Sequence, residues 1–148
     1  MSQMLSDQII SIIDDMQDMT IATVREDNFP QATTVSYVND GVTIFFATDK
    51  NSQKAKNIEK NNRVSMTIDR HYKHWDDIES LSIGAIANLA TDEKEIEKIS
   101  DLMFKKFPRI TQYASNGLED IVFFRLEPKV ISLLDYRQGF GHTESVTL

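Results

Sequence analysis

Residues 31–48 read QATTVSYVNDGVTIFFAT. Both halves of this stretch are rich in β-branched and aromatic residues, which predicts strands at Gln31–Val38 and Val42–Thr48. Asp40-Gly41 between them is a strong hairpin signal. Residues 26–30 have the composition of a turn and follow another predicted strand, Thr20–Arg25. The pattern therefore predicts an antiparallel meander of three strands.

Helical spacing of apolar residues appears on both sides of the meander. Ser6 is the expected N-cap of a first helix, whose buried stripe has helical spacing: Ile9, Ile12, Ile13, Met16 and Met19. A short helix is expected over 52–60, closed by Asn61-Asn62, because asparagine tolerates the left-handed C-cap conformation. Thr91 is the expected cap of a long helix that ends before Pro108, and its buried face comprises Ile96, Ile99, Met103 and Phe107.

Four further strands are predicted at 63–69, 78–89, 120–127 and 129–136. Gly84 marks a bulge or bend, and Pro128 separates the last two strands. With no repeat or flexible linker, residues 1–148 are expected to form a single domain of about six strands and three helices. Consecutive strands with tight turns favour a mainly β fold, a six-stranded antiparallel barrel with appended helices.

Composition excludes several functional classes. Sixteen Lys and Arg against 23 Asp and Glu give a net charge of −7, which disfavours nucleic-acid or anionic-membrane partners. The absence of cysteine excludes disulfide scaffolds, iron–sulfur clusters and thiol catalysis. No apolar stretch approaches the roughly 20 residues of a membrane span. The N-terminal residues lack the basic region of a signal peptide, so a cytoplasmic location is expected.

Lysines at the start of the short helix are the most informative charges. Lys54 falls in the first turn and Lys50 just before the helix, at the end that the helix dipole makes partly positive. A bound anion explains this placement, because backbone N–H groups, the Ser52 hydroxyl and the Lys54 ammonium would converge on a phosphate. The alternative is a solvated lysine face on which Ser52 is only an N-cap.

The motif Ser52-Gln53-Lys54-Ala55-x-x-Ile58-x-x-Asn61-x-Arg63-Val64-Ser65 resembles the flavin-phosphate segment of pyridoxamine 5′-phosphate oxidases and related FMN-binding split-barrel proteins. The hairpin at 30–48 and the order of elements are also similar. The resemblance covers 20–89 in detail and the remainder by element order. It implies a split barrel that binds FMN.

Residue by residue, the resemblance implies an FMN site on the first half of the chain. Ser52 and Lys54 match the phosphate ligands, whereas Gln53 stands where the oxidases usually have arginine. The oxidases also carry cations near Thr33 and Val38 that this chain lacks, so weaker flavin binding or recruitment of Lys50 is expected. Ala47 and Thr48 match the end of the strand that lies along the flavin. Four further residues match the strand that faces the flavin ring and ribityl chain: Thr33, Thr34, Val35 and Ser36.

The resemblance also implies a homodimer with the site at its interface. The second subunit would contribute Glu79 or Ser80 and part of residues 135–142, including Tyr136. Apolar residues on both faces of Val42–Phe46 and Ile121–Phe124 place the expected interface near these strands. The chain ends earlier than the true oxidases, so vitamin B6 oxidase activity is not expected.

The resulting expectation is an FMN-dependent oxidoreductase of unknown substrate, with a small-molecule substrate or electron donor such as NAD(P)H. Its catalytic residues are unassigned, because no acid–base pair stands out and the flavin supplies the chemistry. The alternatives are a non-catalytic flavin-binding protein, a relative that binds haem or a deazaflavin, and a structural dimer. His71 and His74 lie in a predicted loop, so no metal site is expected.

Overall fold

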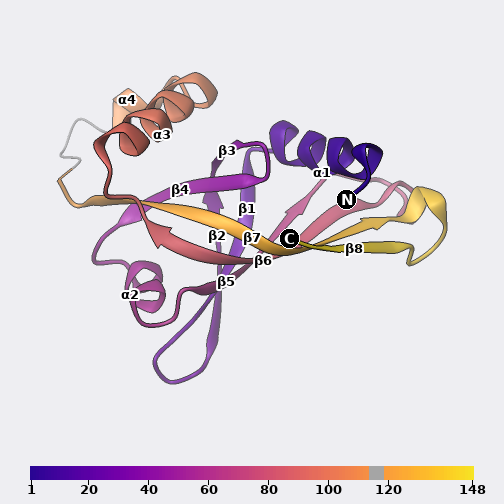
Figure 1. The fold of residues 1–148 in the computed structure, drawn as a ribbon, viewed down its shortest axis with the longest axis horizontal. Coiled ribbons are helices and arrows are strands. Elements are labelled where there is room, and N and C mark those ends of the chain that lie inside the picture. Colours follow the sequence, from indigo (N-terminus) through magenta and orange to yellow (C-terminus); the bar gives the residue numbers. More distant parts are fainter. Residues whose placement is uncertain (114–118) are drawn as a thin grey trace.

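The computed structural model describes residues 1–113 and 119–148 (Figure 1). Within these ranges one antiparallel sheet has the strand order β2-β1-β5-β6-β7-β4-β3, with β8 paired to β7. The strands are β1 (Asp18–Val24), β2 (Pro30–Ser36), β3 (Val38–Asp40), β4 (Thr43–Asp49), β5 (Arg63–Asp69), β6 (Glu79–Leu89), β7 (Ile121–Asp135) and β8 (Thr143–Thr147). The helices are α1 (Gln3–Asp15), α2 (Gln53–Lys60), α3 (Glu93–Lys106) and α4 (Ile110–Tyr113), with short 3₁₀ turns at Trp75–Asp77 and Tyr136–Gln138.

The mainly β, antiparallel barrel with appended helices is confirmed, but the described residues form eight strands and not six. The Asp40-Gly41 hairpin is also confirmed, with Gly41 at φ 60° between β3 and β4. The three-strand meander is wrong, because β2 pairs only with β1, whereas β4 pairs with β3 and β7. The chain changes partner at Tyr37, whose buried hydroxyl donates to the Ile13 carbonyl at 2.6 Å.

Pro128 does not divide the last strand in two, as predicted, but lies within the 15-residue β7. The predicted irregularity at Gly84 is confirmed, and it explains why β7 accommodates a proline. Ala85 pairs with Pro128 and Gly84 with Val130, so Lys129 is an extra residue at this bulge. A ladder interrupted there tolerates the missing N–H of Pro128. A Cβ at position 84 would lie 3.0 Å from Val130 Cγ1, so a larger residue there would require the Val130 side chain to shift.

Several predicted helix ends are corrected by the capping contacts. α1 begins one turn early because Ser2, and not Ser6, is its N-cap, and Ser2 Oγ accepts from the Leu5 N–H at 3.2 Å. α1 ends at Asp15, so Met16 and Met19 lie outside it. α3 begins after Asp92 and not Thr91, and Asn61 closes α2 in an extended conformation. None of the helices in the described ranges is long and apolar enough to cross a membrane.

The core has two parts, one on each face of β4. Ile44 and Phe46 are buried in the barrel interior beneath α1, together with alternate residues of β1, β5, β6 and β7. Phe45 lies on the other face, in a smaller cluster with Ile99 and Met103 of α3. Both faces of β4 are therefore covered within one chain. This removes the reason for placing a dimer interface at Val42–Phe46.

Candidate functional site

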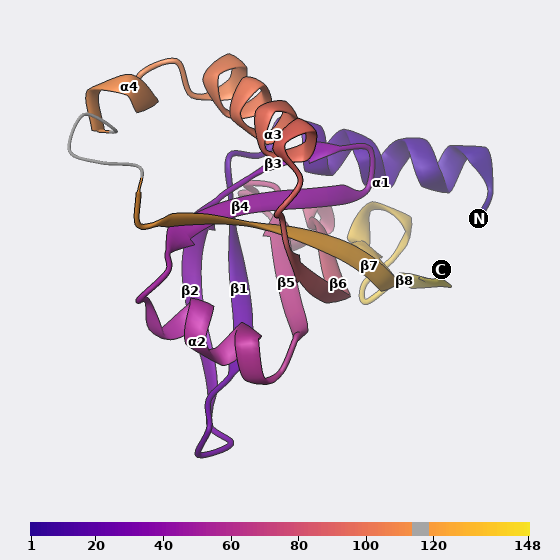
Figure 2. The same cartoon turned by 60° about the vertical axis from the view of Figure 1, so that its left-hand side comes forward.

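The curled sheet leaves two edges that are not joined to each other. β2 is the last strand at one end of the sheet. At the other end, β4 pairs with β3 only over Thr43–Phe45, so within the described ranges its second half has no partner on that side. Figures 1 and 2 show α2 on one side of β4, and α3 and α4 on the other. The ends of β2 and β4 and both helical segments line a common cavity.

This cavity has a volume of about 680 Å³ and brings together five of the eleven residues predicted for the site. These five come from β2, β4 and α2: Val35, Ser36, Ala47, Thr48 and Lys54. The remaining lining comes from the β2–β3 junction and from the α3–α4 segment: Tyr37, Met103, Lys106, Phe107, Pro108, Arg109 and Ile110. The cavity thus combines an apolar surface with three cationic side chains, an arrangement suited to a planar anionic ligand.

Lys54 reaches the cavity from the first turn of α2. Ser52 caps the helix, since its Oγ accepts from the Ala55 N–H at 3.1 Å, and the Thr48 hydroxyl bonds the same Oγ at 3.1 Å. Lys54 forms no ion pair with the residues that the structure describes. Lys50 instead pairs with Asp120 at 3.2 Å and lines a different cavity. The expected recruitment of Lys50 is therefore not supported.

The α3–α4 segment supplies cations that the sequence motif did not indicate. The Lys106 ammonium donates to the Tyr37 carbonyl at 2.9 Å and lies 3.9 Å from the centroid of the Tyr37 ring. Burial lowers the pKa of Lys106 from its usual range. Arg109, three residues later, also lines the cavity. The sequence feature that could have indicated these cations is the cluster of lysine and arginine around Pro108 in an otherwise acidic chain.

The other predicted site residues lie outside the cavity lining. Thr33 is on the same face of β2 as Val35, and its buried Oγ1 has no hydrogen-bond partner among the described residues. Thr34 lines a cavity on the outer face of the sheet, and Gln53 bonds Asn57. Ser52 contacts the lining through Thr48. Among the described residues no group of three or more His, Asp or Glu could hold a metal.

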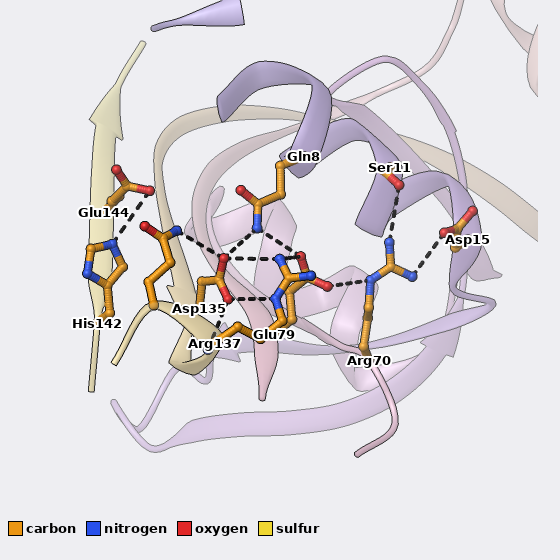
Figure 3. A network of polar contacts seen from close by, with 10 residues as sticks. Gln8, Ser11, Asp15, Arg70, Glu79, Asp135, Arg137, His142 and Glu144 are labelled. Carbon is orange, nitrogen blue, oxygen red and sulfur yellow. Dashed lines mark hydrogen bonds and ion pairs between the residues drawn. The ribbon is translucent and has the colours of Figure 1, made fainter. Parts of the chain in front are cut away.

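Glu79, at the start of β6, lies in a separate polar network with Asp135, at the end of β7 (Figure 3). Tyr136 directly follows Asp135. Glu79 and Asp135 are buried, and the Gln8 amide donates to both carboxylates at 2.8 and 2.9 Å. Arg70 bonds Glu79 at 2.9 Å, and Arg137 bonds both carboxylates, each at 2.9 Å. The Arg137 guanidinium holds the pKa of Asp135 well below its usual range. This network ties α1 to β6 and β7.

The antiparallel sheet, curled into an open barrel with a cavity between its free edges, defines a split-barrel protein. The chain belongs to the pyridoxamine 5′-phosphate oxidase family, whose model matches residues 5–135. The resemblance drawn from the helix-start motif is therefore confirmed. No curated protein matches the chain.

Solved structures confirm the fold. A haem-binding protein from Mycobacterium smegmatis superposes with a TM-score of 0.82 at 16% identity, covering 96% of this chain and 57% of that protein. The chain thus spans little more than half the length of this relative. The haem storage protein HutZ from Vibrio cholerae gives 0.70 at 21% identity, covering 82% and 88% of the two chains. A putative pyridoxamine 5′-phosphate oxidase from Listeria innocua gives 0.72 at 24% identity, covering 88% and 98%.

Proposed function

We propose that the protein binds FMN in the cavity between β2, β4 and α2. The observation that carries this proposal is that three features line one cavity: a capped helix start, a lysine with no ion-pair partner among the described residues, and an apolar wall. Ser52 uses the Ala55 N–H, which leaves the first N–H groups of α2, those of Gln53 and Lys54, available for a phosphate. Lys54 supplies a charge-assisted hydrogen bond.

The remaining lining fits the rest of the molecule. Val35 and Ala47 offer small apolar surfaces on the two strand ends, and Phe107 and Ile110 close the opposite wall. The hydroxyls of Ser36 and Thr48 suit a polyol chain. The unpartnered Oγ1 of Thr33 lies one alternate position before Val35 on β2, which adds an unused polar group beside the cavity.

FMN, when bound, supplies one- and two-electron redox chemistry. The chain's residues bind the phosphate, exclude water from the ring and set the charge around it. Lys106 and Arg109 place positive charge in the cavity, which stabilises additional negative charge there. The described lining contains no carboxylate and no histidine, the side chains that most often act as general bases. The proposed oxidoreductase therefore relies on the flavin, with a small molecule such as NAD(P)H as electron donor.

A non-catalytic haem-binding protein is the second candidate, favoured by structural neighbours that carry that description. Two cationic walls would suit the propionates of haem. Iron, however, needs an axial ligand. The described lining offers only the thioether of Met103 and the phenol of Tyr37, and the Tyr37 hydroxyl is buried and donates to the Ile13 carbonyl. All three histidines lie outside that lining. The cavity of this chain therefore favours FMN.

Titration calorimetry with FMN, riboflavin and hemin distinguishes these candidates. We expect FMN to bind more tightly than riboflavin, because only FMN carries the phosphate, and hemin to bind more weakly than FMN. Tighter binding of hemin would overturn the FMN proposal. NAD(P)H oxidation by the FMN-loaded protein then separates an enzyme from a carrier, since a carrier shows no turnover above free FMN.

The homodimer remains a proposal, and the outer face of the sheet supports it. Hydroxyl residues form a continuous row across six strands: Thr34, Thr20, Thr67, Ser82, Ser132 and Ser145. The adjacent row across four strands has equally small side chains: Ala32, Ala22, Ser65 and Gly84. These positions are exposed or half-exposed. The two rows carry only small, uncharged side chains, which permits close approach of a second copy.

We expect Thr67→Arg to convert the proposed dimer into a monomer. Thr67 lies near the middle of the hydroxyl row, where the bulk of an arginine and the burial of its charge would oppose close contact with a second copy. Sedimentation at micromolar concentration measures the change, with Thr111→Arg on α4 as the matched control. A wild-type chain that sediments as a monomer, or a Thr67→Arg variant that remains a dimer, would contradict this assignment.

A further inference from the structure

A network of uncharged polar side chains, centred on the buried Asn57, attaches α2 to the barrel. Asn57, which is 2% exposed, donates through Nδ2 to Thr23 Oγ1 of β1 at 2.9 Å and to Gln31 Oε1 of β2 at 3.1 Å. Its Oδ1 accepts from Gln53 Nε2 at 2.7 Å. Asn57 therefore satisfies both amide hydrogens and its carbonyl oxygen with three partners from three elements. Thr23 is 1% exposed, so its bond to Asn57 lies inside the protein, whereas Gln31 is half-buried and Gln53 is exposed.

The network fixes the part of α2 that carries Lys54. Gln53 and Asn57 are one helical turn apart, and Lys54 directly follows Gln53. On the other side of this turn, the Thr48–Ser52 hydroxyl contact joins the helix cap to β4. The first turn of α2 is thus held at two points, against β4 by Ser52 and against β1 and β2 by Asn57.

The hydrogen bonds of Asn57 restrict the orientation of α2 more strictly than its apolar contacts do. Ala55 and Ile58 bury the apolar side of α2, but apolar contacts are non-directional and tolerate small rotations of a helix. Hydrogen bonds weaken steeply when their angle changes, so the Asn57 amide fixes the rotation of α2 about its axis. Its partners are uncharged and therefore do not compete with an anion for Lys54.

We propose that Asn57 is a positioning residue for the anion-binding turn of α2. Asn57 holds the turn so that Lys54 and the free N–H groups point at one phosphate, without itself touching the ligand. This inference rests on the proposed binding of FMN. It adds a residue that neither the helix-start motif nor the cavity lining contains.

The test compares the FMN and riboflavin affinities of the Asn57→Ala variant. We expect the FMN affinity to fall roughly tenfold, because a misaligned turn loses about one charge-assisted hydrogen bond, while the riboflavin affinity changes less than about threefold. Thr23→Val is the second variant, since it removes the acceptor for Asn57 with little change of volume. The same selective loss is expected for it, which keeps the test valid if Asn57→Ala fails to fold.

Asn39→Ala is the matched control. Asn39 also joins two elements through its amide, with bonds to Asp14 at 2.7 Å and to the Gly41 carbonyl at 3.0 Å, but it lies outside the cavity lining. We expect this variant to bind both flavins like the wild type. If the folded Asn57 or Thr23 variants lose both flavins equally, or neither, Asn57 has only a structural role. A wild type that binds no FMN overturns the proposed function and this inference together.

Discussion

Lys54→Ala is expected to weaken FMN binding by about 10- to 150-fold. The ammonium supplies a hydrogen bond to a charged group, and such bonds contribute about 1.5–3 kcal/mol. Lys54 lines the cavity and has no ion-pair partner among the described residues, so its loss leaves no protein charge uncompensated. Riboflavin binding should change little, because riboflavin has no phosphate. Calorimetric titration of both flavins measures the difference.

Lys56→Ala is the matched control, because Lys56 belongs to the same helix but is exposed and outside the cavity lining. Both substitutions replace lysine by alanine, which is a strong helix former, so neither should weaken α2 itself. An FMN affinity within about threefold of wild type in Lys54→Ala, under about 0.7 kcal/mol, would show that Lys54 is an ordinary surface charge. Equal losses for FMN and riboflavin would show that Lys54 acts on the fold.

Asp135→Asn is expected to lower the free energy of unfolding at pH 7 by about 2–3 kcal/mol. Asp135 is 2% exposed and accepts from Arg137 at 2.9 Å, from Gln8 at 2.9 Å and from Gln138 at 3.0 Å. An asparagine of the same size loses the charge and turns one acceptor atom into a donor facing other donors. Urea unfolding measures the loss. Asp120→Asn, which breaks an exposed pair with Lys50, should cost less than about 1 kcal/mol.

The pH dependence of this variant follows from the depressed pKa of Asp135, whose largest cause is its hydrogen bond to Arg137. A carboxyl whose pKa is lower when folded contributes its full stabilisation above the ordinary value of 3.8. That contribution is lost as the pH falls through the folded pKa. The unfolding free energy of the wild type should therefore fall more steeply below pH 4 than that of Asp135→Asn. Parallel pH profiles would contradict the assigned role of Arg137.

Local patterns in the sequence predicted most elements but not how they pair. The period of two located β1 and β5, and the Asp40-Gly41 turn predicted a hairpin, because these features depend on neighbouring residues. The partner of β4 is β7, whose residues lie more than 70 positions away, and no local pattern specifies such a pairing. β8 was missed because its five residues are mostly exposed and lack an apolar alternation.

The sequence predicted the part of the candidate site whose residues lie close together in the chain, but not the part that depends on long-range packing. The helix-start motif and the strands before it supplied Val35, Ala47 and Lys54, which are near one another in sequence. Lys106 and Arg109 reach the cavity only because α3 packs on the outer face of β4 through Phe45. That contact joins segments about 60 residues apart and appears only in the folded chain.

Glu79 was predicted as a flavin contact from a second subunit. In the structure its carboxylate is already bonded to side chains of its own chain. It is 8% exposed and is bonded by Arg70, Arg137 and Gln8. A buried carboxylate between two guanidinium groups is satisfied within its own chain. Tyr136 packs edge-on against Phe140, with ring centroids 5.3 Å apart. A ligand contact by either residue would require a second copy, which the proposed dimer supplies.

The absorption spectrum of the purified protein, recorded before and after incubation with FMN and removal of free flavin, tests the central claim most directly. The account predicts the two bands of oxidised flavin, with one FMN retained per chain after the incubation. A protein without flavin bands in both samples would contradict it. So would a protein that shows the Soret band of haem and takes up no FMN.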